Sequence, residues 1–462
     1  MPNRVLLRGG HVLSMDPEVG DVYNGDVLVE DDRIAAVGHS IEADDAEVID
    51  AADCIVIPGF VDSHRHTWET VIRGIAPDVS LAGYFDIVLN QLAPAYRPQD
   101  VYAGNYLGSL EAIDAGVTTL LDWSHINNTP EHADEAIRAL QDARLRAVYC
   151  YGNPNTSLAA WWYTSELKAP EDIRRVREQY FSSDDGLITL AMGTRGPGFC
   201  TPEVVKHDWR LARDVGAPIS VHVGMGPNAG RFSMVSQLND FGLLGPDTTY
   251  IHCNYLSDEE FQLIAETGGK VSIAPSVEMV MGHGTPPTAK ALAHGIRPSL
   301  SIDVVTTVPG DMFTQMRFLF ASDRLLAHEA AFAAGNEQEP ALLTSREVLE
   351  FATIEGARVC GLEGRTGSLT PGKRADIVVV RCDQSNTYPI IDPVSTVVHQ
   401  ADTRNVDTVL VDGRILKRDG QLMEGDLRRA REIAAVSLEY LLEYTTIQPQ
   451  WVQSRRPTAH SH

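Results

Sequence analysis

The spacing of apolar and polar residues changes along the chain. Near the N-terminus, short apolar runs at 4–8, 26–30 and 33–37 are separated by glycine and aspartate residues that are typical of turns. These runs predict β-strands. Because strands of this length cannot enclose a core by themselves, we expect them to pair with strands from another part of the chain.

From residue 54 onward, short β-branched runs alternate with longer helical patterns, which is typical of βα units around a parallel sheet. The eight runs lie at 54–57, 118–122, 145–149, 187–191, 219–222, 249–252, 270–274 and 299–303. They predict an α/β protein built on a (β/α)8 TIM barrel, whose active site lies at the carboxyl ends of the strands. A doubly wound open sheet is the alternative, but the sequence has no Gly-rich dinucleotide loop to favour it.

Strand-like runs return after the barrel pattern, at 376–380 and 408–411. We expect them to pair with the N-terminal strands in one small β-sandwich domain that is built from both chain ends. The predicted division is a β domain at 1–56 and 366–425, a barrel at 57–365, and a C-terminal helix and tail at 426–462. His460 and His462 lie in that tail and are interpreted as solvated residues rather than metal ligands.

Composition narrows the function classes. The net charge of −25 disfavours a nucleic-acid or anionic membrane partner. No apolar run approaches the roughly 18 residues of a membrane span, and the first residues lack the apolar core of a signal peptide. Six cysteines without Cys-x-x-Cys spacing are typical of free, buried thiols in a reducing compartment. The sequence therefore predicts a cytoplasmic protein that acts on a small molecule.

Polar side chains end four of the predicted strands. His64 and His66 follow the first run two residues apart, so their imidazoles project to the same side of a strand. His222 ends the fifth run, His252 the sixth and Asp303 the eighth. A lone histidine is more often a core or surface residue than a ligand. Imidazoles and a carboxylate that meet at a barrel rim nevertheless describe a catalytic metal site with an open position.

Two stretches resemble motifs of the amidohydrolase superfamily. They are PGFVDSHRH at 58–66 and GSLTPGKRADIV at 367–378, and the similarity covers nearly the whole chain. The order and spacing most resemble the branch that contains cytosine deaminase and the triazine hydrolases. The resemblance implies one divalent metal ion per chain, with Zn2+ expected and Fe2+, Mn2+ or Co2+ as alternatives. Its implied ligands are His64, His66, His222 and Asp303.

The resemblance also implies roles for the residues around that ion. His252 would hydrogen-bond the metal-bound water or the substrate. The fourth predicted strand has no lysine that carboxylation could convert into a bridge between two metals, which favours a mononuclear site. A metal-activated water, Asp303 as its proton acceptor and His252 as a stabiliser of developing charge together give a hydrolase.

One position departs from the pattern of the deaminases in this branch. They usually place a glutamate, the proton shuttle, three residues after the fifth-strand histidine, whereas this chain has Met225. Two residues that follow the seventh strand, Glu278 and His283, are candidates to replace it, although loop packing is an equal alternative for each. We favour Glu278, because an apolar setting would raise its pKa. In the competing account, Glu278 pairs with Arg65 and only orients the histidine pair.

Other residues are candidates for substrate contact. Trp123 and His125 follow the second strand, where aromatic side chains commonly wall an apolar substrate. Met279 fits a deformable pocket wall, although core packing is an alternative. Arg65 is a further candidate, with a salt bridge to an acidic neighbour as the alternative. The aromatic run at 161–163 predicts either a lid over the pocket or the core of a homo-oligomer interface, in a dimer or tetramer.

These observations favour an enzyme. The leading hypothesis is a metal-dependent hydrolase that cleaves a C–N bond other than a peptide bond, in an amide, urea, carbamate or thiocarbamate of a small organic molecule. The alternative is an aminohydrolase, or deaminase, of a heteroaromatic ring such as a nucleobase or triazine. A binding or assembly subunit without activity is a third class, which the presence of all the proposed ligands disfavours.

Overall fold

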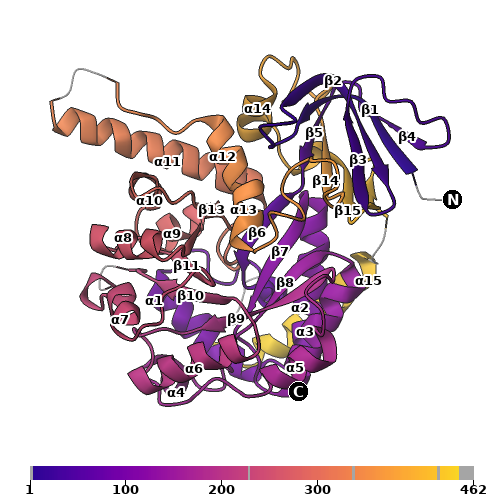
Figure 1. Cartoon of the computed structure of the whole chain (residues 1–462). Helices are drawn as coiled ribbons and strands as arrows, with labels where there is room; N and C mark the ends of the chain where they lie inside the picture. The colour runs from indigo at the N-terminus through magenta and orange to yellow at the C-terminus, as the bar shows by residue number, and fades with distance from the viewer. Residues whose placement is uncertain (1–3, 227–228, 336–338, 424–426, 447–462) are drawn as a thin grey trace, which may run out of the picture.

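The computed structural model describes residues 4–226, 229–335, 339–423 and 427–446. Within them the chain forms two sheets, one of eight strands and one of nine (Figure 1). The predicted tail with His460 and His462 lies outside the described residues. None of the described helices is long and apolar enough to cross a membrane.

The eight-stranded sheet is a closed barrel. All of its neighbouring strands run parallel in sequence order. The ends of the sheet meet where the Asp303 amide donates to the His64 carbonyl at 3.0 Å and the His66 amide donates to the Asp303 carbonyl at 2.8 Å. The strands are β6 (Phe60–Arg65), β7 (Val117–Ser124), β8 (Arg146–Tyr151), β9 (Ile188–Thr194), β10 (Ile219–Val223), β11 (Thr248–His252), β12 (Lys270–Ile273) and β13 (Ser299–Leu300). The predicted (β/α)8 barrel is confirmed.

Helices cover the outside of the barrel (Figure 1). Several begin at capping boxes; in α8, for example, Ser257 accepts from the Glu260 amide while the Glu260 carboxylate accepts from the Ser257 amide. The longer helices are α2 (Pro98–Asp114), α3 (Pro130–Ala143), α5 (Ile173–Tyr180), α6 (Pro202–Asp214), α7 (Met234–Asp240), α8 (Asp258–Glu266), α11 (Met312–Ala333), α12 (Ser345–Phe351) and α15 (Leu427–Leu442).

Short helices occupy the connections between these elements. The loop after β6 is the longest of those at the rim and contains η1 (Thr67–Ile72), α1 (Leu81–Tyr84), η2 (Phe85–Leu92) and η3 (Ala93–Ala95). The others are α4 (Leu158–Trp162), η4 (Ala229–Arg231), α9 (Pro275–Met281), α10 (Thr288–Ala293), α13 (Ile354–Val359), α14 (Pro393–Ser395), η5 (Thr396–Gln400) and η6 (Thr403–Asn405).

The second sheet combines strands from both ends of the chain. Its order is β17-β16-β15-β14-β5-β1-β2-β3, with β4 on β1, so β5 and β14 join the two ends. Apolar side chains of both ends share one buried cluster. The predicted pairing is therefore present, as one continuous sheet, while the boundaries at 56, 365 and 425 stay predictions. The strands are β1 (Arg4–Leu13), β2 (Asp21–Glu30), β3 (Arg33–Gly38), β4 (Glu47–Asp50), β5 (Cys54–Pro58), β14 (Ile377–Arg381), β15 (Val406–Val411), β16 (Arg414–Arg418) and β17 (Gln421–Leu422).

One strand assignment is wrong. The run at 54–57 lies in β5 of the second sheet, where Ile57 pairs with Val378, and the histidine pair lies at the end of the next strand, β6, with His64 inside it and His66 directly after it. The chain passes between the sheets at Gly59, where any Cβ atom would overlap the Thr118 side chain. Both strands are fully buried, so apolar residues continue from β5 into the start of β6. No polar residue marks the boundary between the two strands.

A buried ion pair joins the barrel to the second sheet. The Arg146 side chain, 1% exposed at the start of β8, donates to Asp376 at 2.6 Å and to Asp412 at 2.7 Å. Thr366 donates a further hydrogen bond to Asp376. Because these contacts lie at the end of the barrel where the strands begin, they hold the two sheets together on the side opposite the carboxyl ends of the strands.

Candidate active site

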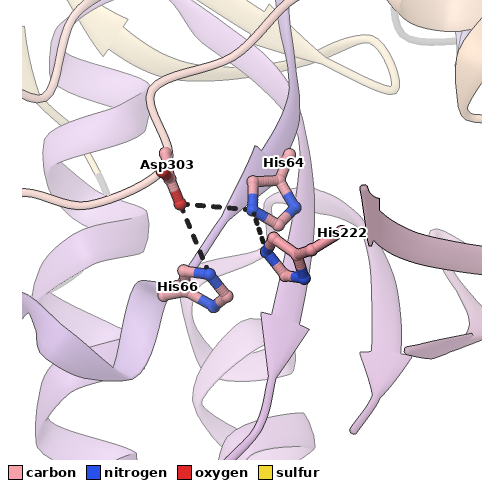
Figure 2. A group of neighbouring side chains, drawn as sticks. All are labelled: His64, His66, His222 and Asp303. Atoms are coloured by element: carbon pink, nitrogen blue, oxygen red, sulfur yellow. Dashed lines mark hydrogen bonds and ion pairs between the residues drawn. The ribbon is translucent and has the colours of Figure 1, made fainter. Parts of the chain in front are cut away.

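Four side chains converge at the rim of the barrel (Figure 2). His64 lies near the end of β6, His66 directly follows that strand, His222 lies on β10, and Asp303 follows β13. The Nε2 atoms of His64 and His66 lie 3.2 and 3.3 Å from Asp303 Oδ1. His222 Nε2 lies 3.1 Å from His64 Nε2. All four residues are buried, so their polar atoms face one another rather than solvent.

Neighbouring groups fix the direction of these side chains. His66 Nδ1–H donates to the Trp123 carbonyl at 2.8 Å, which leaves Nε2 with its lone pair toward the cluster. Asp303 and His252 both have φ in the left-handed region, at +68° and +73°. Residues other than glycine hold such a conformation only where the surroundings enforce it, and such residues concentrate at active sites.

The protonation states of the cluster suit a cation. Burial lowers the pKa of His66 to about 3 and the pKa of His222 well below its usual range, so both imidazoles are neutral. Burial alone would raise the pKa of Asp303, but the His64 hydrogen bond and the nearby His252 hold it well below its usual value. Three imidazole nitrogens and an ionised carboxylate that point at one place form a donor set for a divalent metal.

A second buried pair lies beside the cluster. His252 Nδ1 is 3.1 Å from Glu278 Oε1, and Glu278 also accepts from the Asn254 amide group at 3.0 Å. Burial opposes protonation of His252, but the hydrogen bond to Glu278 and the negative charges of Asp303 and Glu278 together outweigh it and raise the pKa of His252. The other ring nitrogen, Nε2, lies 3.7 Å from Asp303 Oδ2. Glu278 therefore holds His252 with Nε2 toward the four-residue cluster.

A cavity opens above the cluster. The polar part of its lining consists of five histidines and Asp303, and Tyr84 adds one hydroxyl group at the side. The rest is apolar, and it comes largely from the loops after the strands rather than from the strands. The lining residues are His66, Leu81, Tyr84, Phe85, Leu89, His125, Trp162, His222, Met225, His252, Met281, His283, Asp303 and Val304.

Comparison with known proteins agrees with this site. Residues 55–416 match the amidohydrolase family. A 5'-deoxyadenosine deaminase from Methanosarcina mazei is 31% identical over 450 residues, which covers 95% of this chain and 98% of that protein. The chain belongs to the amidohydrolase family. A 5-methylthioadenosine/S-adenosylhomocysteine deaminase from Symbiobacterium thermophilum is 30% identical over 449 residues, or 94% of this chain and 98% of the relative.

Solved structures show the same fold. A zinc-bound adenosine deaminase from Xanthomonas campestris superposes with a TM-score of 0.80 at 21% identity and covers 95% of this chain and 98% of its own. An atrazine chlorohydrolase from Arthrobacter aurescens, complexed with zinc, gives 0.79 at 22% identity over 94% and 100% of the two chains. The resemblance to the branch of deaminases and triazine hydrolases is thereby confirmed. The protein is a hydrolase of C–N bonds, and its cluster supports a divalent metal.

The cavity of this amidohydrolase contains two of the histidines expected from the sequence. His125 accepts from the Trp68 indole N–H at 3.2 Å through Nδ1, so its other ring nitrogen carries the proton. His283 is 2% exposed, and neither of its ring nitrogens has a hydrogen-bond partner among the described residues. Burial lowers the pKa of His283 to about 3, which keeps the ring neutral near pH 7.

Three expected substrate contacts do not line the cavity. Trp123 lies beneath the cluster, with its ring centroid 4.6 Å from that of His222 and its Nε1–H donating to Ser220. Arg65 alternates with the two inward histidines and points out of the barrel to Glu111, which also pairs with Arg73. Met279 lies on the far side of α9, because two residues along a helix turn the side chain by about 200°. Met281 takes its place in the lining.

The two proton-transfer candidates, Glu278 and His283, lie in different places. Glu278 is fully buried behind His252 and does not line the cavity, whereas His283 does. The account in which Glu278 pairs with Arg65 is wrong, because Glu278 binds His252 and Arg65 binds Glu111. Glu278 accepts from the Ala274 amide at the start of its own helix, and this bond turns the carboxylate toward β11.

Sequence reasoning missed one wall of the cavity. Leu81, Tyr84, Phe85 and Leu89 line it from a single helical segment, α1 and η2. They are spaced by three, one and four residues, which places them on one face of a helix. This spacing is the sequence pattern that could have predicted the wall. The segment lies in a loop between β6 and α2, where such a face is normally interpreted as barrel packing.

Proposed function

We propose that this amidohydrolase cleaves the C–N bond of a small, largely apolar amide, urea, carbamate or thiocarbamate. The observation that carries the proposal is the lining beside His222. Met225 lies there, and Asp303 is the single carboxylate among the described residues that line the cavity. The shuttle glutamate expected of a ring deaminase is therefore absent from the cavity as well as from the sequence.

The proposed cofactor is one divalent metal ion per chain, with zinc preferred and iron, manganese or cobalt as alternatives. His64, His66, His222 and Asp303 would hold it, and their converging nitrogen and oxygen atoms support this assignment. A bound divalent ion lowers the pKa of water from 15.7 toward about 7, which supplies a nucleophile at neutral pH. Zinc in the structures of the adenosine deaminase and the atrazine chlorohydrolase supports the preferred ion.

Three side chains are proposed to move or hold protons. Asp303, ionised at the rim, accepts the proton of the attacking water. His252, whose pKa the Glu278 contact raises, donates from Nε2 to the carbonyl oxygen as negative charge develops there. His283, neutral and without a partner, receives the water's proton from Asp303, whose carboxylate lies within 4.8 Å of the ring, and delivers it to the departing nitrogen. This delivery is needed because an amide anion is a very poor leaving group, and such relays contribute about 10²–10⁴-fold.

The apolar walls support the substrate class. Leu81, Phe85 and Leu89 face Trp162 and Met281 across the cavity. Alkyl or aryl substituents on nitrogen would bury favourably between them. The several hydroxyl groups of a ribose need hydrogen-bond partners when buried, and outside the catalytic groups and His125 the described lining offers them Tyr84 alone.

The alternative is deamination of a heteroaromatic ring, and a specific observation favours it. The relatives from Methanosarcina mazei and Symbiobacterium thermophilum are named as deaminases of adenosine derivatives and align over nearly the whole chain. In that reaction His283 would replace the missing glutamate. The expected cytoplasmic location and the homo-oligomer, dimeric or tetrameric, stay predictions.

A substrate screen tests the proposal. Zinc-loaded protein is offered N-alkyl and N-aryl amides, ureas, carbamates and thiocarbamates, together with 5'-deoxyadenosine and aminotriazines. Amine release from the first group should exceed ammonia release from the second by at least about tenfold in kcat/KM. Faster release of ammonia from the nucleoside or the triazine would overturn the proposal in favour of the deaminase.

A further inference from the structure

A carboxyl group that has no role in the mechanism lies beneath the cavity wall. Glu69 is in η1, three residues after His66, and its side chain is fully buried. Its Oε1 accepts from the Tyr84 hydroxyl at 2.5 Å, and its Oε2 accepts from the Thr306 hydroxyl at 3.4 Å. No lysine, arginine or histidine of the described residues lies within ion-pair distance of it.

This arrangement costs stability. Transfer of a carboxyl group from water to the interior without a cation is unfavourable, and burial raises the pKa of Glu69 well above its usual range. A glutamine would keep one oxygen acceptor for these hydroxyl groups without that cost. A buried carboxyl group that lowers stability in this way is expected where function requires it. The two partners of Glu69 indicate what it serves.

Tyr84 connects Glu69 to the wall of the cavity. It is the last residue of α1 and is followed by η2, an eight-residue π-helical stretch, and such stretches are frequent at functional sites. Leu81, Phe85 and Leu89 of the same segment line the cavity beside it. The Phe85 ring meets the Trp162 ring edge-on at 5.7 Å, so the segment also packs against α4.

Thr306 connects Glu69 to the opposite side. It lies three residues after Asp303, in a stretch whose backbone accepts hydrogen bonds from Gly74 and Ala76. The Glu69 carboxyl group therefore bridges the loop of the metal-ligand aspartate and the helical wall. A short O–H···O bond to a carboxyl group is among the stronger hydrogen bonds in proteins, so the Tyr84 contact fixes the wall more firmly than apolar packing alone.

We propose that Glu69 is a positioning residue that anchors the α1–η2 segment through Tyr84, and that this anchored wall selects the substituent on the substrate nitrogen. The substituent it accepts is an alkyl or aryl group that packs on Leu81, Phe85 and Trp162. The selection rests on the proposed function, whereas the anchor does not, so the two are tested by separate measurements.

Hydrogen exchange tests the anchor. In the metal-loaded protein, Glu69→Ala and Tyr84→Phe should each speed amide exchange across residues 81–92 by at least about fivefold, because each removes the same bond. Glu69→Gln keeps an oxygen acceptor and should stay close to wild type. Tyr102→Phe is the matched control, since Tyr102 donates to Asp142 at 2.8 Å on the outside of the barrel. Unchanged exchange at 81–92 in both Glu69→Ala and Tyr84→Phe would overturn the proposal.

Kinetics test the selection. For a substrate with a bulky N-substituent, Glu69→Ala and Tyr84→Phe should raise KM by about tenfold and leave kcat within about threefold. The effect should be smaller for an N-methyl substrate and absent in Tyr102→Phe. The double variant should resemble either single variant, because both act through one hydrogen bond.

The outcomes separate the anchor from its alternatives. A fall in kcat or in metal content with unchanged KM would show that Glu69 acts through Asp303, and would overturn the inference. Failure to cleave any substrate with an N-alkyl or N-aryl group would instead contradict the proposed function. The exchange result would then decide the anchor by itself.

Discussion

The rim of the barrel and the wall above it differ in what holds their side chains. The rim residues come from strand ends, where backbone hydrogen bonds between β6 and the Asp303 loop set their positions. The wall residues come from α1, η2 and α4, which lie in loops and are held by side-chain contacts. Chemistry and selectivity are therefore placed on elements that can change separately, as is usual for barrels of this class.

This difference predicts two kinds of variant. Changes at the rim remove groups that act on the transition state, so they should lower kcat. Changes in the wall alter how the substrate is held, so they should raise KM and leave kcat nearly unchanged. A rim variant that affects KM alone, or a wall variant that abolishes turnover, would contradict the division.

The largest effect is expected at Asp303. Asp303→Ala should lose the bound metal and lower kcat/KM by at least about 10⁴-fold, because the ligand, the activated water and the proton acceptor are lost together. Elemental analysis and amine release measure the two losses. His294→Ala, which alters a histidine outside the cavity, is the control and should keep its metal. Full metal and activity in Asp303→Ala would refute the site.

A smaller loss is expected at His283. His283→Asn should lower kcat by about 10²-fold with the metal content unchanged, because the relay to the departing nitrogen is removed. Burial holds the pKa of His283 at about 3, so the ring is neutral well above that pH. The loss should therefore be the same across about pH 6 to 9, since this residue does not titrate there.

Glu278→Gln is the comparison for that variant. Because Glu278 contacts His252 and not the cavity, its loss should lower kcat by less than the loss of His283. Were Glu278→Gln the more damaging of the two, the Glu278–His252 pair rather than His283 would carry the larger share of catalysis, which is closer to the role first expected from the sequence. Equal activity of both variants and wild type would leave Asp303 as the sole group that handles the proton.

The same division explains what the sequence could predict. Strand alternation and the strand-end rule of barrels are sufficient to bring His64, His66, His222 and Asp303 together, because backbone geometry fixes those positions. The direction of Glu278 depends on one hydrogen bond to the Ala274 amide, and no sequence pattern contains that bond. Trp123 was expected in the cavity because it follows the predicted strand. In the structure β7 extends through Trp123, and the side chain points into the barrel and packs beneath His222.

Wall residues were harder to predict. Met279 and Met281 are two residues apart on α9, and which one faces the cavity depends on how the helix is rotated about its axis. The face of Leu81, Tyr84, Phe85 and Leu89 has the helical period, but that period alone cannot distinguish a cavity from the core. Glu69 lies three residues after His66, a proposed metal ligand, yet its contact with Tyr84 is formed only by the fold.

A substitution at Met225, which lines the cavity, tests whether the wall decides between the two candidate reactions. Met225→Glu restores a carboxylate three residues after His222, where the branch usually has its shuttle. We expect release of ammonia from an aminoheterocycle to rise by about tenfold, while cleavage of substrates with apolar N-substituents falls because the cavity gains a charge. Both rates are measured on the same metal-loaded preparation. Unchanged selectivity would show that the residue beside His222 does not decide between the two reactions.

The smallest effect is expected in the wall itself, at Trp162. Its ring lies between Phe85 at 5.7 Å and Phe199 at 5.1 Å, and its Nε1–H donates to Asn155 at 2.7 Å. Trp162→Leu keeps an apolar surface but removes the aromatic edge, so KM for an N-aryl substrate should rise by about fivefold with kcat unchanged. The adjacent Trp161 is also buried but packs beneath Arg195 and does not line the cavity.

Trp161→Leu is therefore the matched control for the wall. It removes a similar buried area, so both variants should lose thermal stability, while KM should rise in Trp162→Leu alone. If both raise KM equally, the loss of packing in α4 is responsible, and the wall acts only as a scaffold. If Trp162→Leu lowers kcat by more than its effect on KM, the ring acts on the transition state, and the division between rim and wall fails at this residue.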